Sequence, residues 1–269
     1  MNRRALLAGA ASLGVSQTLH AAPAGTAPEP PAGTIQILTY HRIEQRENPP
    51  GTIVSPATFA AQMQTLADRA IPVRRLAEVQ AQSQSGTITG HSVALTADDG
   101  WRSVFTEMFP ILQRHRLPIT LFINPPMIGT GHAFLTWDMV AELRASGLVD
   151  IQAHTLSHPN FNTERHRRTP QDFAAFLHHE IADCRTLLQD RLQEEVQSLA
   201  WPFGIHDAQL EEAASQAGYT AAYALGSKPI TNHAPKFALP RSQIYETDNP
   251  TRFTWIAQGN TRTHPTPTM

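Results

Sequence analysis

Two adjacent aspartates, Asp98 and Asp99, follow an apolar run at residues 93–95 and precede Gly100. If the run is a buried strand, two negative charges at its end are unfavourable unless a cation or hydrogen bonds stabilise them. Neighbouring strand residues face opposite ways, so the two carboxylates can serve one site only where the strand becomes a turn, which Gly100 favours. One aspartate can then bind a metal ion while the other acts as a general base. An Asp-Asp-Gly surface turn is the common alternative.

A pair of histidines with the spacing H-x3-H, His154 and His158, follows the apolar run VDIQA. The chain has 13 histidines, so chance predicts roughly 0.6 such pairs, and the spacing alone does not indicate zinc. With one carboxylate, two imidazoles make the three-ligand set that leaves a catalytic zinc an open position for water. Spacing and location leave this interpretation and that of two surface histidines about equal.

Two further candidates each follow a predicted strand. In the turn AWPFG, Pro202 has no N–H, but the backbone N–H of Phe203 could point at a ligand. His41 follows the first predicted strand and could donate a proton. Taken singly, such a turn is more often only a turn, and a lone histidine is more often structural than catalytic.

The hydrophobic pattern predicts alternating strands and helices, which favours a parallel sheet with helices outside it, open or closed into a barrel. In such a fold the carboxyl ends of the strands meet at one edge, so the polar residues described above should converge there. The predicted strands cover residues 34–43, 91–100, 118–124, 148–154, 198–204 and 219–225, and the predicted helices cover 55–70, 103–117 (interrupted near Pro110), 136–147, 171–192 and 207–217.

Composition limits the classes of function. The 269 residues are 41% hydrophobic and 16% charged, typical of a globular protein with a substantial core. A formal net charge of -2 does not favour binding to nucleic acid or to an anionic membrane surface. The single cysteine, Cys184, excludes an internal disulfide and a cysteine zinc site. The sequence does not identify a protein partner.

The N-terminus has the order of a secretory signal peptide. Arg3 and Arg4 precede an apolar stretch at residues 5–15, and small residues follow. We predict a signal peptide at 1–24, a Pro-rich linker at 25–33 and a catalytic domain at 34–269. No later segment is apolar for long enough to cross a membrane. The protein is therefore expected to be exported, periplasmic or secreted; a disordered cytosolic tail is the alternative.

Three motifs together resemble the polysaccharide deacetylase family, carbohydrate esterase family 4. The family's T-F-D-D-G stands here as Thr96–Gly100, with Ala97 in place of the aromatic residue. Its H-[ST]-x-x-H matches His154–His158, and its Pro-aromatic-Gly turn matches Pro202–Gly204. The order and separation of the motifs also agree, and the similarity extends from about residue 34 to 245.

The resemblance implies a distorted (β/α)7 barrel and a divalent metal ion, usually Zn²⁺. It assigns the metal ligands to Asp99, His154 and His158 and the catalytic base to Asp98. The backbone N–H of Phe203 would help to hold the oxyanion. The implied reaction is hydrolysis of an N-acetyl group on a sugar, which releases acetate and leaves a free amine.

The sequence departs from the family at the general acid, because the usual Leu-x-His near the C-terminus is not found. The stretch LTYHRI instead resembles the branch that deacetylates poly-β-1,6-N-acetylglucosamine, in which a histidine of the first strand replaces that acid. This resemblance makes His41 the expected acid. The Leu-Pro-Arg of the same branch matches residues 239–241, so Arg241 could pair with Asp98 and keep it ionised.

The expected function is therefore metal-dependent N-deacetylation of an extracytoplasmic polysaccharide, with poly-β-1,6-N-acetylglucosamine as the leading substrate. Deacetylation of peptidoglycan, a chitin-like glycan or O-acetylated xylan is an alternative. A catalytically silent carbohydrate-binding protein is another. Three aromatic residues could stack on sugar faces if they lie at the rim, although burial in the core is equally expected: Tyr40, Trp137 and Trp201.

Overall fold

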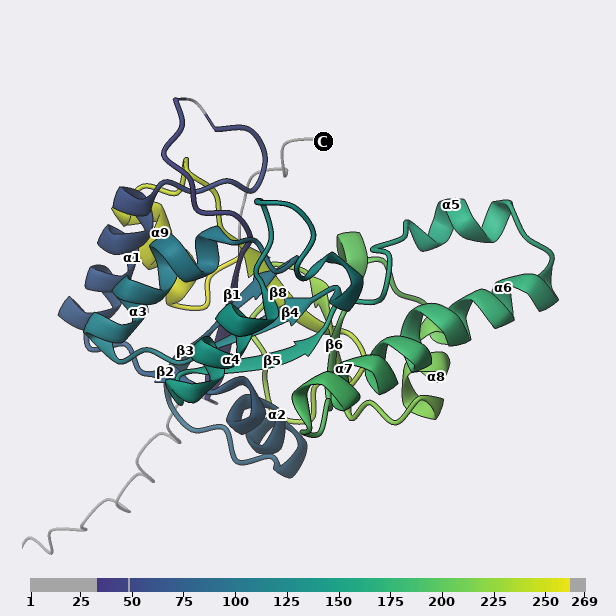
Figure 1. Cartoon of the computed structure of the whole chain (residues 1–269). Coiled ribbons are helices and arrows are strands. Elements are labelled where there is room, and N and C mark those ends of the chain that lie inside the picture. Colours follow the sequence, from purple (N-terminus) through teal and green to yellow (C-terminus); the bar gives the residue numbers. More distant parts are fainter. Residues whose placement is uncertain (1–32, 48, 262–269) are drawn as a thin grey trace, which may run out of the picture. The chain divides into compact units, whose positions relative to one another are not determined.

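The strands in the described part of the chain are parallel and close into a ring of seven (Figure 1). The computed structural model describes residues 33–47 and 49–261. The sequence pattern allowed either an open sheet or a closed barrel. Because β1 pairs with both β3 and β8, the sheet is closed, and the expected seven-stranded barrel is confirmed. A two-residue strand, β2 (Val73–Arg74), pairs with β3. The ring consists of β1 (Thr34–Tyr40), β3 (His91–Asp98), β4 (Ile119–Ile123), β5 (Val149–Ala153), β6 (Ser198–Ala200), β7 (Ala221–Leu225) and β8 (Leu239–Gln243).

Alternation along β3 separates the two faces of the barrel wall. Every second residue from Val93 to Ala97 joins the large apolar cluster that the helices also enter. Thr96 and Asp98 face the interior instead, where both contact Arg241 of β8. A strand buried on both faces reads as a nearly continuous apolar run, which is why residues 91–98 predict a strand so clearly. Because of this alternation, Asp98, the last residue of β3, points into the barrel interior.

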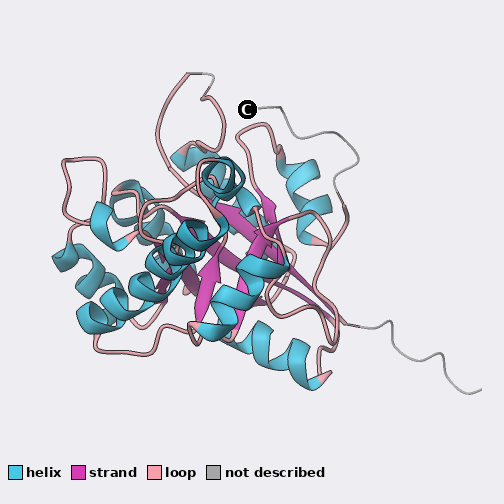
Figure 2. Ribbon diagram, turned by 90° about the vertical axis from the view of Figure 1, so that its right-hand side faces the viewer, coloured by secondary structure: helices cyan, strands magenta, loops and turns pink. Residues whose placement is uncertain are grey.

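Helices surround the ring of strands (Figure 2). The predicted helix at residues 55–70 is confirmed: Ser55 caps it by accepting a hydrogen bond from the Thr58 N–H, and Pro56 is its first residue. The described α-helices are α1 (Pro56–Asp68), α2 (Leu76–Ser85), α3 (Phe109–His115), α4 (Trp137–Ala145), α5 (Phe161–His166), α6 (Pro170–Leu177), α7 (Cys184–Leu192), α8 (Ala208–Gln216) and α9 (Pro250–Ala257).

The predicted helix at residues 171–192 is interrupted. Between α6 and α7 the chain makes a π-helical turn, His178–Asp183, which carries the buried carboxylate of Glu180. Another π turn, Val104–Met108, precedes α3, close to the interruption expected near Pro110. Such turns in a helix often occur near functional sites.

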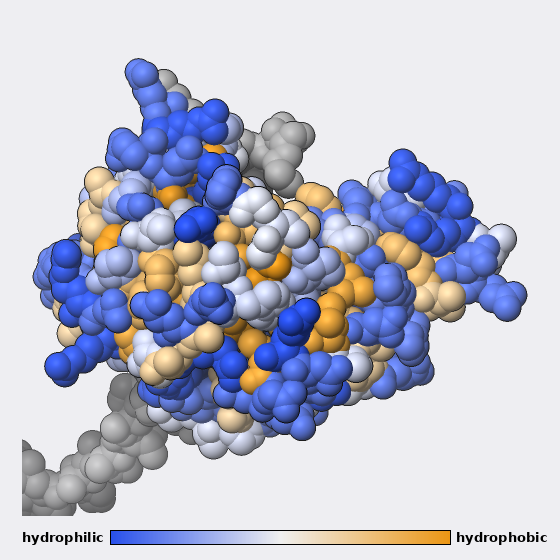
Figure 3. Space-filling view, viewed as in Figure 1, coloured by the Kyte–Doolittle hydropathy of each residue, from blue (hydrophilic) through white to orange (hydrophobic). Residues whose placement is uncertain are grey.

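The sequence pattern did not predict β2, β8, α2, α5 or α9. Pro240 lies within β8 and has no N–H to give to a ladder, so this segment lacks the usual strand signature. The α5–α6 segment extends away from the strands in Figure 1, and its surface is largely hydrophilic in Figure 3. None of the described helices is both long and apolar enough to cross a bilayer. The predicted signal peptide, and the predicted linker as far as residue 32, lie outside the described residues.

Candidate active site

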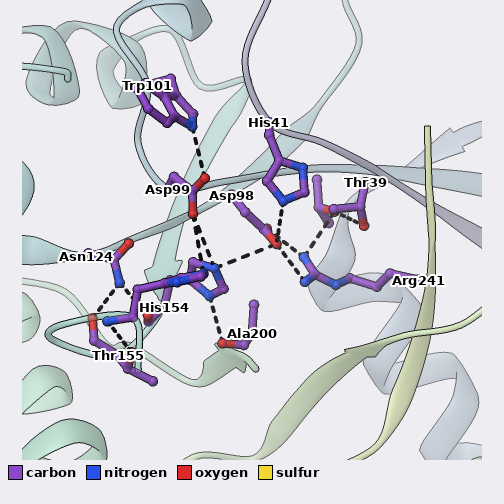
Figure 4. Close-up of polar contacts among 12 residues, drawn as sticks. Thr39, His41, Asp98, Asp99, Trp101, Asn124, His154, Thr155, Ala200 and Arg241 are labelled. Atoms are coloured by element: carbon purple, nitrogen blue, oxygen red, sulfur yellow. Dashed lines mark hydrogen bonds and ion pairs between the residues drawn. The ribbon is translucent and has the colours of Figure 1, made fainter. Parts of the chain in front are cut away.

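The candidate residues converge at the carboxyl ends of the strands, as the alternation of strands and helices predicts (Figure 4). Asp98 is the last residue of β3, His41 follows β1, and His154 follows β5. Arg241 reaches the same place from within β8. Residues more than 140 positions apart therefore share one small volume.

Three side chains form a cluster with the donor atoms of a metal site. The Oδ1 atom of Asp99 lies 3.5 Å from Nε2 of His154 and 3.7 Å from Nε2 of His158. These three atoms all lie within 4.8 Å of one another, and no other such group of three occurs among the described residues. Two ligands of a tetrahedral zinc lie about 3.4 Å apart, so the observed spacing fits a zinc ion bound by two imidazoles and one carboxylate.

The backbone turns sharply where the two aspartates diverge. Asp99 and Gly100 both have left-handed backbone conformations, with φ of 74° and 75°. A Cβ on Gly100 would lie 2.8 Å from Cδ1 of Ile128, so a larger residue would have to displace that side chain and would also adopt a strained φ. This turn lets Asp98 stay in the barrel interior while Asp99 faces the two histidines, which answers how neighbouring carboxylates can serve one site.

Hydrogen bonds behind the cluster orient its members. The Nδ1 atom of His154 lies 2.8 Å from the carbonyl oxygen of Ala200, so this nitrogen donates, and in the neutral imidazole Nε2 carries the lone pair that faces the cluster. The indole N–H of Trp101 donates to Oδ2 of Asp99 at 2.9 Å. The side-chain amide of Asn124 donates to the carbonyl oxygens of His154 and Thr155. Two members of the cluster, Asp99 and His154, are thus each oriented by a hydrogen bond from or to a neighbouring group.

The loop between the two histidines is held by a buried carboxylate. Glu180, 2% exposed, accepts hydrogen bonds from the backbone N–H groups of Leu156 and Ser157 at 3.1 and 2.9 Å. It also accepts one from the Ser157 hydroxyl at 2.6 Å. Charge-assisted bonds of this kind are stronger than neutral ones, so Glu180 holds the loop that presents His158, which itself has a φ of 54°.

Asp98 forms a bidentate ion pair with Arg241. The two N···O distances are 2.7 and 2.8 Å, and both side chains are almost fully buried. Burial alone raises the pKa of Asp98, but the Arg241 guanidinium and the nearby histidines outweigh it and leave that pKa below its usual value. Asp98 is therefore ionised at neutral pH.

His41 faces Asp98 from the opposite side. Its Nε2 atom lies 4.0 Å from Oδ2 of Asp98, and its Nδ1 atom is buried without a hydrogen-bond partner in the described part of the chain. Burial lowers the pKa of His41 below 6.5, and the carboxylates of Asp98 and Asp99 offset this only partly. When protonated, His41 is therefore a stronger acid than an exposed histidine.

The pKa values of the two clustered histidines are shifted in opposite directions. Burial favours the neutral form of His154, but the adjacent Asp98 and Asp99 raise its pKa above 6.5. Burial and the charge of His154 lower the pKa of His158 to about 4. Burial opposes ionisation of Asp99, yet the surrounding histidines hold its pKa well below the usual range. At neutral pH the Asp99 carboxylate is therefore ionised and the His158 imidazole is neutral.

The aromatic residues divide between core and rim. Tyr40 and Trp201 are buried, at 0% and 1% exposed, so neither can stack on a sugar, and Trp137 is half-buried on α4. Phe203 is 45% exposed, and its ring lies 4.7 Å from that of His158. Phe203 has a φ of 57°, a left-handed conformation that is rare for a phenylalanine.

Sequence reasoning missed three residues that surround the site: Trp101, Asn124 and Glu180. Trp101 follows the Asp-Asp-Gly turn directly, so its proximity was available from the sequence, but its hydrogen bond was not. Asn124 ends the predicted third strand, which places it at the correct edge. Glu180 gave no signal, because it lies on a helix 22 positions beyond His158 in the sequence.

The chain is similar to a family of known proteins. The family model described as polysaccharide deacetylase matches residues 85–222, just over half of the chain. That span includes Asp98, Asp99, both clustered histidines and Phe203. His41 and Arg241 lie outside it.

Among curated relatives, a Bacillus subtilis (strain 168) protein described as a polysaccharide deacetylase, YxkH, is 24% identical over 211 residues, which are 78% of this chain and 71% of the relative. The poly-β-1,6-N-acetyl-D-glucosamine N-deacetylase of Staphylococcus aureus (strain MRSA252) is 21% identical over 196 residues, 71% of this chain and 67% of the relative.

Solved structures share the fold. The Streptococcus pyogenes deacetylase PplD superimposes with a TM-score of 0.74 at 20% identity, over 84% of this chain and 99% of that one. IcaB from Ammonifex degensii gives a TM-score of 0.72 at 22% identity, over 85% and 98% of the two chains. The family match and the shared barrel lead to one conclusion: the chain belongs to the polysaccharide deacetylase family, whose reaction is the hydrolysis of amide bonds on polysaccharides.

Proposed function

We propose that this protein is a metal-dependent N-deacetylase that removes acetyl groups from N-acetylglucosamine residues of a polysaccharide outside the cytoplasm. The observation that carries the proposal is the position of Asp98. Its Oδ2 atom lies 4.0 Å from Nε2 of His41 and 3.9 Å from Nε2 of His154. The Asp98 carboxylate, the His41 imidazole and the cluster therefore surround one point, which supports their proposed roles as base, acid and metal ligands in amide hydrolysis.

The metal ligands in this proposal are Asp99, His154 and His158. A zinc ion held there would act as a Lewis acid and would lower the pKa of the attacking water. Asp98 would take the proton of that water. The Arg241 ion pair keeps Asp98 ionised and directs its carboxylate, so the base is oriented before the substrate binds.

His41 would protonate the leaving nitrogen. An amine leaves poorly unless it receives a proton, and the Nε2 atom of His41 faces the reaction centre beside Asp98. The low pKa of His41 makes its imidazolium a strong donor, and the two aspartates nearby stabilise that charge. The backbone N–H of Phe203, a residue whose ring contacts that of His158, would donate to the oxyanion, where one such donor typically contributes about 3 kcal/mol.

Poly-β-1,6-N-acetylglucosamine is the proposed substrate. The support is the LTYHRI stretch that contains His41, the Arg241 pairing with Asp98, and the similarity to a Staphylococcus aureus enzyme named for this polymer. The signal-peptide pattern at residues 1–24 supports an exported protein that acts in the periplasm or beyond the cell. The domain at 34–269 would then be the mature catalytic part.

The test is acetate release from β-1,6-linked N-acetylglucosamine oligomers by the purified protein, before and after chelation and with zinc restored. Metal-dependent release is expected. Release only from peptidoglycan, chitin-like glycans or acetylated xylan would move the proposal to another polymer. If Asp98→Asn left both sugar binding and every hydrolytic activity unchanged, Asp98 would not be the base, and the alternative of a carbohydrate-binding protein would gain support.

The role of His41 has a sharper test. His41→Ala should reduce hydrolysis of an N-acetyl substrate far more than hydrolysis of a matched O-acetyl ester, because an alkoxide leaves more easily than an amine. His178→Ala, at a histidine whose side chain is 74% exposed, is the matched control and should change neither rate. Equal losses on amide and ester would show that His41 does not act as the general acid.

A further inference from the structure

Trp101 lies directly beyond the metal-ligand cluster and is fixed there by neighbouring loops. Its backbone forms an isolated antiparallel bridge with Phe134, and its ring stacks on that of Phe134 with centroids 4.8 Å apart and planes 18° from parallel. The guanidinium carbon of Arg42 lies 5.0 Å from the centroid of the Trp101 ring. Arg42 is itself held by Glu44 at 2.8 Å.

Two backbone hydrogen bonds secure the same junction. The N–H of Arg102 donates to the carbonyl of Ala133 at 2.8 Å, and the N–H of Leu135 donates to that of Gly100 at 2.9 Å. The indole is therefore packed between the loop after β1, which carries His41, and the loop after β4. Its ring has little freedom to turn, so its N–H direction is set by the fold.

That direction is toward Asp99 (Figure 4). The indole N–H donates to Oδ2 of Asp99 at 2.9 Å, whereas Oδ1 is the oxygen that lies near the two histidines. With Oδ2 so engaged, rotation of the carboxylate is restricted and Oδ1 is presented to the cluster. A hydrogen bond to a charged acceptor typically contributes more than a neutral one, which makes this restraint effective.

We propose that Trp101 is a positioning residue that holds Asp99 in the orientation required to bind the metal ion. The inference rests on the proposed metal site, and it extends that site to a residue that binds neither metal nor substrate. Because Phe134 and Arg42 pack on its ring, Trp101 does not offer a sugar-stacking surface. Its contribution is the N–H group.

The experiment compares Trp101→Phe with Trp137→Phe. Phenylalanine retains an aromatic ring for Phe134 and Arg42 but has no N–H. Trp137 is a fair control because it is also half-buried and also lies near an arginine, with the Arg191 guanidinium carbon 5.5 Å from its ring centroid. The readouts are the zinc dissociation constant, measured by competition with a chromophoric chelator, and the melting temperature of the metal-free protein.

Trp101→Phe should weaken zinc binding by about 10–100-fold, the usual effect of removing a hydrogen-bond partner of a metal ligand. Trp137→Phe should bind zinc as the parent does, and the metal-free melting temperatures of the two variants should be similar. Unchanged zinc affinity in Trp101→Phe, or an equal loss in both variants, would overturn the inference while leaving the metal site in place. If the parent itself bound no zinc, the proposed metal site would fail and this inference with it.

A second measurement needs no substitution and decides the matter if Trp101→Phe does not fold. The chain has four tryptophans, so its nitrogen-15 NMR spectrum should show few indole N–H signals, and contacts with the Phe134 ring identify that of Trp101. This signal should exchange with solvent more slowly than that of Trp255, which is 52% exposed. It should also shift on addition of zinc while the Trp137 signal stays in place. If the chemical shift of the Trp101 signal did not change on addition of zinc, the inference would be overturned.

Discussion

Arg241 and Asp98 form a bidentate ion pair inside the barrel, although 143 positions separate them in the sequence. They meet because β1 pairs with β3 on one side and with β8 on the other, so the closed ring brings the two strands close. Forming a buried ion pair of this kind adds little to the free energy of unfolding, because both charges are taken out of water. Removing one partner lowers that free energy much more, because the remaining charge is left without compensation.

Asp98→Asn should therefore affect both catalysis and stability. Loss of the base is expected to reduce kcat by about 10²–10⁴-fold. Loss of the only carboxylate bonded to the Arg241 side chain in the described structure should lower the free energy of unfolding by about 3–5 kcal/mol. Activity assays and urea denaturation measure the two effects, and Asp138→Asn, at an exposed position on α4, is the control.

A double variant separates the two effects. Asp98→Asn with Arg241→Met removes both charges, so it should be more stable than Asp98→Asn alone while remaining inactive. If the double variant were the less stable of the two, the stability lost in Asp98→Asn would not come from an uncompensated Arg241.

Zinc affinity should depend on pH through His154. The pKa of His154 is raised above 6.5, so this imidazole takes up a proton at a higher pH than an exposed histidine does. A metal ion must displace that proton in order to bind. The affinity should then fall by about tenfold per pH unit below that pKa. His158, with a pKa of about 4, should add to the loss only in more acidic solution.

Chelator competition between pH 8 and pH 5 measures this dependence. His178→Ala should show the same profile as the parent, because His178 is exposed and pairs with Asp183 on the π turn. An affinity that stayed constant down to pH 6 would mean that His154 is neutral in the metal-free protein, contrary to the expectation.

Glu180→Gln tests the support of the His154–His158 loop. The carboxylate accepts three hydrogen bonds, whereas glutamine would turn its NH₂ group toward some of the same donors. The free energy of unfolding should fall by about 1–3 kcal/mol, and zinc binding should weaken as His158 loses its support. Urea denaturation and zinc competition provide the measurements. Glu212→Gln, on the exposed face of α8, should change neither quantity, and equal behaviour of the two variants would argue against this role.

Asp150→Asn should stabilise the protein at neutral pH. Burial raises the pKa of Asp150 above that of the unfolded chain, despite hydrogen bonds from Gln152 and Thr120. The unfolded chain therefore ionises first as the pH rises above 3.8, and the native state loses stability until the folded-state pKa is passed. The melting temperature of Asp150→Asn should exceed that of the parent at pH 7, and the difference should shrink toward pH 4. A lower melting temperature at pH 7 would show that the carboxylate is favourable where it lies.

The sequence by itself identified the parts of the site that depend on local structure. Asp98 and Asp99 follow an apolar run that predicts a buried strand, and Gly100 supplies a turn with positive φ. The same logic places His154 after the run VDIQA. Because parallel strands share one edge for their carboxyl ends, these local patterns were enough to predict that distant residues converge.

Only the tertiary structure decided which residues touch. Pro240 leaves β8 without the usual strand pattern, so the residue pattern alone did not predict where Arg241 lies. The pairing of Arg241 with Asp98 was expected only from the Leu-Pro-Arg resemblance, and it forms because the barrel closes through β1. Neither the Trp101 hydrogen bond to Asp99 nor the Glu180 bonds to the histidine loop has a signature in composition or spacing. Such contacts depend on how strands and loops far apart in the chain pack together, and local preference carries no information about that packing. Residue types therefore indicated a candidate chemistry, while the closed barrel brought together the neighbouring side chains that orient the candidate residues and shift their pKa values.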